Sequence, residues 1–175
     1  MKLDFKPEPT EFAPSYSNYL DLVPESDIRD AYAAQPAELR AALESLPEDR
    51  GTFAYDEGKW TIKEVVSHII DCERIFAYRM HRISRGDATP IEGFDQESPG
   101  YTAFSHANER TFSDLLEEFE LVRRSNSLML NNMDEADLRR MGTANELSIS
   151  VRALAGIMIG HVRHHLNILK ERYLG

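Results

Sequence analysis

The strongest helix start in this sequence is the stretch Trp60-Thr61-Ile62-Lys63-Glu64-Val65-Val66-Ser67-His68. Thr61 and Glu64 form a capping box, because the threonine side chain can accept a hydrogen bond from the backbone N–H of Glu64 while the glutamate reaches back to the cap. Trp60 precedes this cap and is placed to pack onto the new helix. Apolar residues then recur at helical intervals up to Gly86, so the stretch predicts a long amphipathic helix.

A second pattern lies near the C-terminus, in Gly160-His161-Val162-Arg163-His164-His165-Leu166. It belongs to a helix predicted over residues 150–173. His161 and His165 are four residues apart, so their side chains lie one turn apart on the same helical face. His164 lies about 100° from its neighbour His165 around the helix, so it does not share their face. We therefore expect His164 to form a hydrogen bond, to lie in an interface or to be exposed.

Two further helical patterns complete the prediction. One covers about 26–46, with Ser26 or Asp27 as its cap and with Pro36 predicting a kink or a late start. The other runs from the region of Phe104 to about Met133, with an apolar face that includes Phe104 and Phe112.

The segments between these helices are predicted to be mostly irregular. Residues 86–101 form a long loop, which is uncommon in a compact domain and usually has a function. Residues 134–138 predict a short helical turn, and 143–149 predict an extended connection. With no convincing alternation of a β-strand, the chain predicts an all-α four-helix bundle with long loops.

Length and charge limit the classes of function. A chain of 175 residues predicts one bundle domain, residues 26–175, preceded by a proline-rich arm, residues 1–25, that packs on it. The net charge of −10 argues against nucleic acid and anionic membranes as partners. The single cysteine and the lack of a long apolar span predict a soluble, cytoplasmic protein.

Three histidines fall on inward-facing stripes: His68 on the helix that follows Thr61, and His161 and His165 on the last helix. A bundle brings such stripes together, and one divalent metal ion would satisfy three buried imidazoles that are otherwise costly to bury. Three protein ligands would leave positions open for water or substrate, as in catalytic sites. The alternative is three core histidines with ordinary hydrogen bonds.

Other residues near this stripe have less defined roles. We expect Cys72, one turn after His68, to be a small buried residue, with a fourth ligand as the alternative. Arg79 lies on the same stripe and predicts an ion pair with Glu117 or Glu120, with an anionic substrate as the alternative. His106 is expected on the surface or near the pocket. No catalytic role is assigned to Asp71 or Glu73.

The stretch from Trp60 to His68, followed by Asp71 and Glu73, and the terminal His161-Val162-Arg163-His164-His165 together resemble the DinB family, in its YfiT-like branch. The resemblance covers roughly residues 26–173. It implies a four-helix bundle, often a homodimer, with a divalent metal such as nickel or zinc on the triad His68, His161 and His165.

The same resemblance implies a range of activities. Members are described as metal-dependent hydrolases, and relatives as transferases or isomerases that use low-molecular-weight thiols such as bacillithiol or mycothiol. We therefore predict a metal-dependent enzyme that activates water or a thiol against a small-molecule substrate. The alternative is a non-catalytic metal- or ligand-binding stress-response protein.

Overall fold

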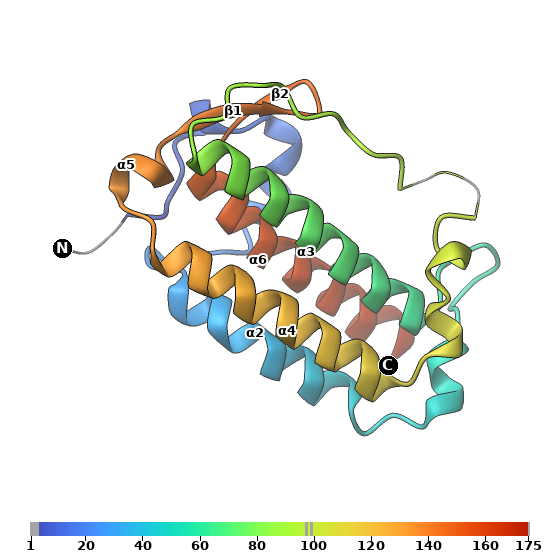
Figure 1. The fold of residues 1–175 in the computed structure, drawn as a ribbon. Helices are drawn as coiled ribbons and strands as arrows, with labels where there is room; N and C mark the ends of the chain where they lie inside the picture. The colour runs from blue at the N-terminus through green and yellow to red at the C-terminus, as the bar shows by residue number, and fades with distance from the viewer. Residues whose placement is uncertain (1–3, 97, 99, 175) are drawn as a thin grey trace.

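The computed structural model describes residues 4–96, 98 and 100–174. Its body is formed by four long helices that lie side by side (Figure 1). Their bounds are Arg29–Leu43 for α2, Ile62–Ser84 for α3, Phe112–Asn131 for α4 and Val151–Ile168 for α6. The predicted all-α four-helix bundle is confirmed.

The remaining elements are short and lie mainly at the two ends of the bundle (Figure 1). They are the 3-10 helices η1 Pro9–Glu11, η2 Pro14–Tyr16, η3 Glu48–Thr52, η4 Ala103–Ser105 and η5 Ala107–Glu109, the helices α1 Ser17–Leu20 and α5 Glu135–Leu138, the strands β1 Met141–Ala144 and β2 Leu147–Ser150, and the π-helical turn η6 Leu169–Tyr173. The predicted turn at 134–138 is confirmed as α5.

The order of the helices around the bundle differs from their order in the chain. α3 contacts both α4 and α6, and α2 contacts the same two helices, so α2 and α3 lie diagonally opposite each other. The neighbours α3 and α4 run in the same direction, and the chain returns along the bundle between them (Figure 1). Parallel neighbours need such a long crossover. The loop predicted at 86–101 belongs to it, although its residues 97 and 99 lie outside the described residues.

The capping box at the start of α3 is formed as predicted. The backbone N–H of Glu64 donates to Thr61 Oγ1 at 3.2 Å, and the backbone N–H of Thr61 donates to Glu64 Oε2 at 2.8 Å. Trp60 packs against the apolar cluster that contains Val65. The helix therefore starts at a fixed residue, which fixes the direction of every side chain on its inward stripe.

The starts of two other helices differ from the prediction. α2 begins at Arg29 and continues through Pro36, so the late start was wrong. α4 begins only at Phe112, where the side chain of Thr111 accepts from the backbone of Asp114. Phe104, expected on its apolar face, is 80% exposed. His106 has a left-handed φ of 53°, which a continuous right-handed helix cannot contain.

The extended connection predicted at 143–149 is part of an antiparallel hairpin. β1 pairs with β2 from Met141 opposite Ser150 to Ala144 opposite Leu147. Asn145 and Glu146 form its turn with φ of 52° and 63°, as a two-residue hairpin turn with two left-handed residues requires. Strands of four residues are too short to show a clear alternation in the sequence, which is why the hairpin was missed.

Two apolar clusters fill the bundle and are separated by a buried polar layer. One cluster includes Phe76 and Ile157, and the other includes Ile69 and Val162. Each long helix contributes polar side chains to the layer between them, which contains Gln35, His68, Glu73, Arg123, Asn126 and His161. Buried polar groups are costly unless paired, so this layer is where a function is expected.

The N-terminal segment packs on α6 through a close backbone contact. A Cβ atom on Gly160 would lie 2.0 Å from the backbone oxygen of Tyr19, so only glycine fits there. This approach brings the ring of Tyr19 to 5.5 Å from that of His161 and 5.4 Å from that of His164, measured between ring centroids. Residues 1–3 of the predicted arm lie outside the described residues.

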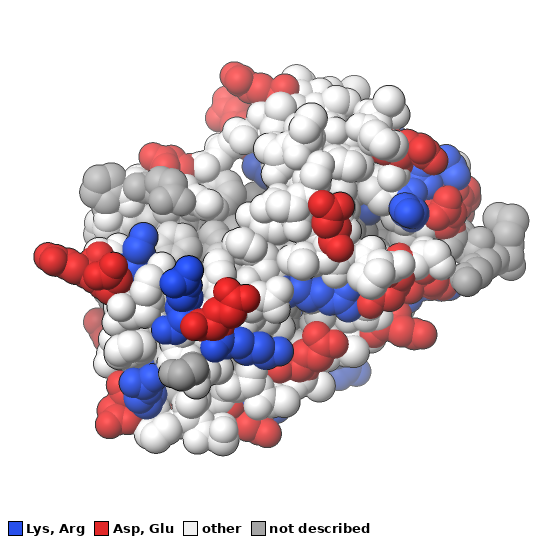
Figure 2. Space-filling model, turned by 180° about the vertical axis from the view of Figure 1, so that it is seen from behind, with Lys and Arg blue, Asp and Glu red and all other residues white. Residues whose placement is uncertain are grey.

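Charged side chains of both signs are mixed on the face that Figure 2 shows. Basic groups lie beside acidic ones on this face and do not form a broad basic surface. Across the described part of the chain, no helix combines the length and the apolar character that a bilayer span requires.

Candidate metal centre

Three histidine side chains converge between α3 and α6. His161 Nε2 lies 3.1 Å from His68 Nε2 and 3.1 Å from His165 Nε2. His68 and His161 are buried, with 2% and 5% of their surface exposed, and His165 is half-buried. The structure therefore brings together the three residues predicted as ligands, whose binding of a metal stays a prediction.

Hydrogen bonds between the rings cannot account for this convergence. A ring nitrogen carries either one hydrogen or one lone pair, so His161 Nε2 completes one good hydrogen bond and not two. Its short distances to both neighbours instead suit three lone pairs directed at one ion. Nitrogens bound to a tetrahedral metal at about 2.0–2.1 Å lie roughly 3.3 Å apart, close to the two distances from His161 Nε2 to its neighbours.

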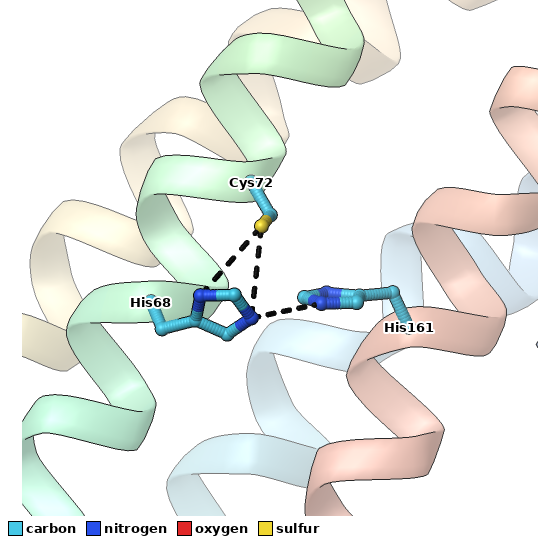
Figure 3. Close-up of side chains that lie close together, drawn as sticks. All are labelled: His68, Cys72 and His161. Atoms are coloured by element: carbon cyan, nitrogen blue, oxygen red, sulfur yellow. Dashed lines mark hydrogen bonds between the residues drawn. The ribbon is translucent and has the colours of Figure 1, made fainter. Parts of the chain in front are cut away.

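A fourth possible ligand is the thiol of Cys72, one turn after His68 (Figure 3). Cys72 Sγ lies 3.7 Å from His68 Nε2, and potential ligand atoms of His68, Cys72 and His161 all lie within 4.8 Å of one another. We expected Cys72 to be a small buried residue. It is buried, but its sulfur also faces the histidines, so two ligand sets share His68 and His161.

The protonation of these groups favours the three-histidine set. Burial lowers the pKa of His68 to about 4 and that of His165 to about 3, with neighbouring histidines adding to the effect. Burial also lowers the pKa of His161 well below its usual value. All three rings are thus neutral at pH 7, the form that binds metals. Burial raises the pKa of Cys72 to about 12, so a metal would have to displace its proton.

Aromatic rings enclose the imidazoles. Trp60 lies 4.8 Å from His68, and Phe76 lies 5.9 Å from His161, between ring centroids. Tyr19 covers His161 from the N-terminal segment. Trp60 therefore has two roles, because it precedes the capping box of α3 and its ring also packs against His68. Such surroundings reduce the contact of His68 and His161 with water and strengthen electrostatic interactions there.

The other histidines lie outside the cluster of Nε2 atoms. The ring of His164 packs edge-on against His165 at 5.1 Å and against Tyr19. His106 is exposed, as the first expectation held, and its Nδ1 lies 3.4 Å from Glu109; the alternative, that it reaches the pocket, was wrong. Its left-handed backbone, which was not foreseen from the sequence, directs the chain away from a helix at this point.

The ion pair predicted for Arg79 is absent from the described residues. Glu120 instead pairs with Arg40 at 2.6 Å, and no described carboxylate pairs with Arg79. Arg79 is nevertheless buried, with 4% of its surface exposed. The helical spacing of the sequence correctly predicted that Arg79 lies on the inward face of α3. It gave no information about which face of α4 carries Glu117 and Glu120.

A cavity of about 260 Å³ adjoins the candidate metal centre. His161 and Cys72 lie at its wall, together with Tyr19, Phe76 and Arg79. A cavity of this size accommodates a small molecule, and one whose wall includes a potential metal ligand is a natural substrate site. His161 and Cys72 therefore adjoin a space large enough for a small molecule.

The buried pair Glu73 and Arg123 was not foreseen. Arg123 Nη2 lies 2.8 Å from Glu73 Oε2, and both side chains are 1% exposed. Tyr32 Oη and Asn126 Nδ2 both donate to Glu73 Oε1, at 2.9 and 2.8 Å. The signal was present in the sequence, since Arg123 and Asn126 lie three residues apart on the apolar stripe of their helix. The pair fixes the polar layer behind the histidines.

Comparison with family models matches residues 31–169 to the DinB superfamily. The chain belongs to this superfamily. A relative from Geobacillus thermodenitrificans (strain NG80-2), named "Putative metal-dependent hydrolase", is 27% identical over 146 residues, which are 79% of this chain and 80% of the relative.

The DinB fold also agrees with a solved structure. YfiT from Bacillus subtilis, described as "a probable metal-dependent hydrolase with an unusual four-helix bundle topology", superposes with a TM-score of 0.72 at 17% identity. The match covers 96% of this chain and 91% of YfiT. The family resemblance predicted from the two histidine-containing stretches is confirmed.

The lowered histidine pKa values make the stability of this DinB protein depend on pH. In metal-free protein, the free energy of unfolding is expected to fall as the pH falls from 6.5 towards 4. Between these pH values His68 binds a proton in the unfolded chain and stays neutral in the folded chain. Lowering the pH therefore favours the unfolded state. This histidine alone contributes about 1.4 kcal/mol per pH unit, and above 6.5 its contribution is constant.

Urea unfolding of chelator-treated protein at a series of pH values measures this dependence. His68→Gln is the comparison, because glutamine does not titrate and its slope should be shallower. An identical slope for His68→Gln and the natural protein would contradict the assigned pKa.

Proposed function

We propose that this DinB-superfamily protein is a metal-dependent hydrolase whose divalent ion is bound by His68, His161 and His165. The single observation that supports this most is the position of His161 Nε2, which lies 3.1 Å from the Nε2 atoms of both His68 and His165. The names of the Geobacillus relative and of YfiT agree with the reaction class. Nickel and zinc are the proposed ions, since imidazole suits both.

A divalent ion held by these histidines would supply a Lewis acid, which can polarise a carbonyl and lower the pKa of water or of a low-molecular-weight thiol. The chain itself supplies the arrangement around it. α3 and α6 hold the imidazoles at fixed separation, burial keeps them neutral, and the rings of Trp60, Tyr19 and Phe76 limit access by bulk water. The substrate enters from the cavity beside His161.

Water, for hydrolysis, and a low-molecular-weight thiol, for transfer, would occupy the same open position on the metal ion. A thiol in that position would make the protein a thiol-dependent transferase, so both reactions belong in one test. The small-molecule substrate and the homodimer that the family resemblance implies are part of this proposal.

Metal analysis of protein purified without a histidine tag, combined with activity assays, tests the proposed function. We expect about one nickel or zinc ion per chain, and hydrolysis of an ester or amide panel that a chelator abolishes and added metal restores. Thiol conjugation on a parallel panel would identify the transferase. Stoichiometric metal without turnover on either panel would favour a non-catalytic metal-binding protein, and absence of metal would exclude the metal site.

A further inference from the structure

Arg79 is a buried cation without a partner among the described residues. Its surface is 4% exposed, and its Nε atom is buried without any hydrogen-bond acceptor. No described carboxylate forms an ion pair with it, and the nearest described interaction is with the Phe76 ring, whose centroid lies 5.8 Å from the guanidinium carbon. A charge buried in this way is costly unless something else binds it.

The position of Arg79 relates it directly to the candidate metal centre. It lies on the same stripe of α3 as Cys72, seven residues further on, which corresponds to about 10 Å along the helix. Both side chains reach the wall of the 260 Å³ cavity that His161 also lines. The guanidinium and the imidazole of His161 therefore bound the same space, with Phe76 of the intervening turn between them.

The rest of the cavity wall indicates what could fill it. Part of the wall is aromatic, contributed by Tyr16, Tyr19, Phe76 and Phe94, and these rings suit a flat apolar body. Arg79 is the one basic side chain among the described residues at the wall, and the acidic Asp95 lies there as well, so a second negative charge on a ligand would find no further cation. This balance favours a ligand with a single negative charge over a dianion such as a phosphate ester.

We propose that Arg79 binds a carboxylate of the substrate, and that the substrate is a small aromatic or apolar monocarboxylate. A guanidinium binds a carboxylate through two parallel N–H···O bonds, which fixes the orientation of the ligand as well as its charge. The carboxylate at Arg79 directs the other end of the molecule toward His161. This assignment rests on the proposed function in taking the cavity as the substrate site, but it does not require that a metal be bound.

Calorimetric titration with benzoate, and with benzamide as the uncharged analogue of the same shape, tests this assignment. Both titrations are made with metal-free and with zinc-loaded protein, so that binding of benzoate to the metal is separated from binding at Arg79. We expect benzoate to bind the metal-free protein at least about tenfold more tightly than benzamide.

Arg79→Met should abolish this preference, and Arg79→Lys should retain part of it, because lysine keeps the charge but not the two parallel bonds. Arg124→Met is the matched control, since it removes the same charge from an exposed position on α4. Circular dichroism shows whether each variant is folded.

Equal binding of benzoate and benzamide by the natural protein would overturn the assignment, and this comparison needs no variant to fold. Tighter binding of inorganic phosphate than of benzoate would overturn it as well. Because the decisive titrations use metal-free protein, failure at Arg79 is distinguishable from failure of the metal site. A protein that prefers benzoate but holds no metal would retain the carboxylate site and lose the proposed hydrolase.

Discussion

Replacing His161 with alanine is expected to weaken zinc and nickel binding by more than about 100-fold, since loss of even an outer partner of a ligand costs 10–100-fold. His161 is one of the two residues that both possible ligand sets require, and its Nε2 atom lies 3.1 Å from two other ring nitrogens. Competition with a chelating dye, on untagged protein, measures the affinity.

The same titration distinguishes between the two ligand sets. If the triad of His68, His161 and His165 binds the metal, His165→Ala should cause a loss similar to that of His161→Ala, while Cys72→Ala should change the affinity little. His164→Ala is the control, because its ring packs beside His165 without facing the cluster.

The opposite pattern has an equally clear meaning. A large loss in Cys72→Ala together with a small loss in His165→Ala would assign the ligands to His68, Cys72 and His161, the group whose potential ligand atoms lie within 4.8 Å of one another. Unchanged binding in His161→Ala would exclude both sets.

Glu73→Ala is expected to lower the free energy of unfolding by about 3–5 kcal/mol. The substitution leaves the Arg123 guanidinium buried without its carboxylate, and it removes the acceptor of Tyr32 and Asn126. For a chain of this length, the melting temperature should fall by roughly 10 °C. Urea unfolding of metal-free protein at pH 7 measures the change.

A surface pair provides the matched comparison. Glu120 pairs with Arg40 at the exposed side of α4, so Glu120→Ala should cost less than about 1 kcal/mol. The double variant Glu73→Ala with Arg123→Met should recover part of the stability, since it leaves no buried charge unpaired. If Glu73→Ala lowers the free energy of unfolding by less than about 1 kcal/mol, the pair of Glu73 and Arg123 does not stabilise the fold as expected.

Much of the fold and of the candidate site was predictable because the information is local. The capping box of Thr61 and Glu64 involves residues three apart, and it fixes where α3 begins. From that start, helical periodicity places His68 inward, and the same periodicity places His161 and His165 on one face of α6. The hairpin and the late start of α4 were missed because left-handed residues such as Asn145 and His106 decide them, and single left-handed residues leave little trace in a hydrophobic pattern.

Charge pairing shows the limit of such patterns. Arg79 and Arg123 both lie on inward stripes, and nothing in either stripe distinguishes them. In the folded chain Arg123 meets Glu73 at 2.8 Å, whereas Arg79 meets no described carboxylate and faces a cavity. The difference depends on which helices are neighbours and on their rotation relative to each other.

The sequence by itself therefore determined the helices, the family and the three inward histidines, since each depends on residues within a few turns of one another. Only the tertiary structure decided that His161 Nε2 meets the Nε2 atoms of His68 and His165, that Cys72 adjoins His68 and that Arg79 remains unpaired among the described residues. These features depend on contacts between α3 and helices distant in the chain, and the diagonal placement of α2 and the parallel crossover to α4 set those contacts. Such an arrangement arises from packing the whole core at once, which local hydrogen bonds and periodicity do not encode.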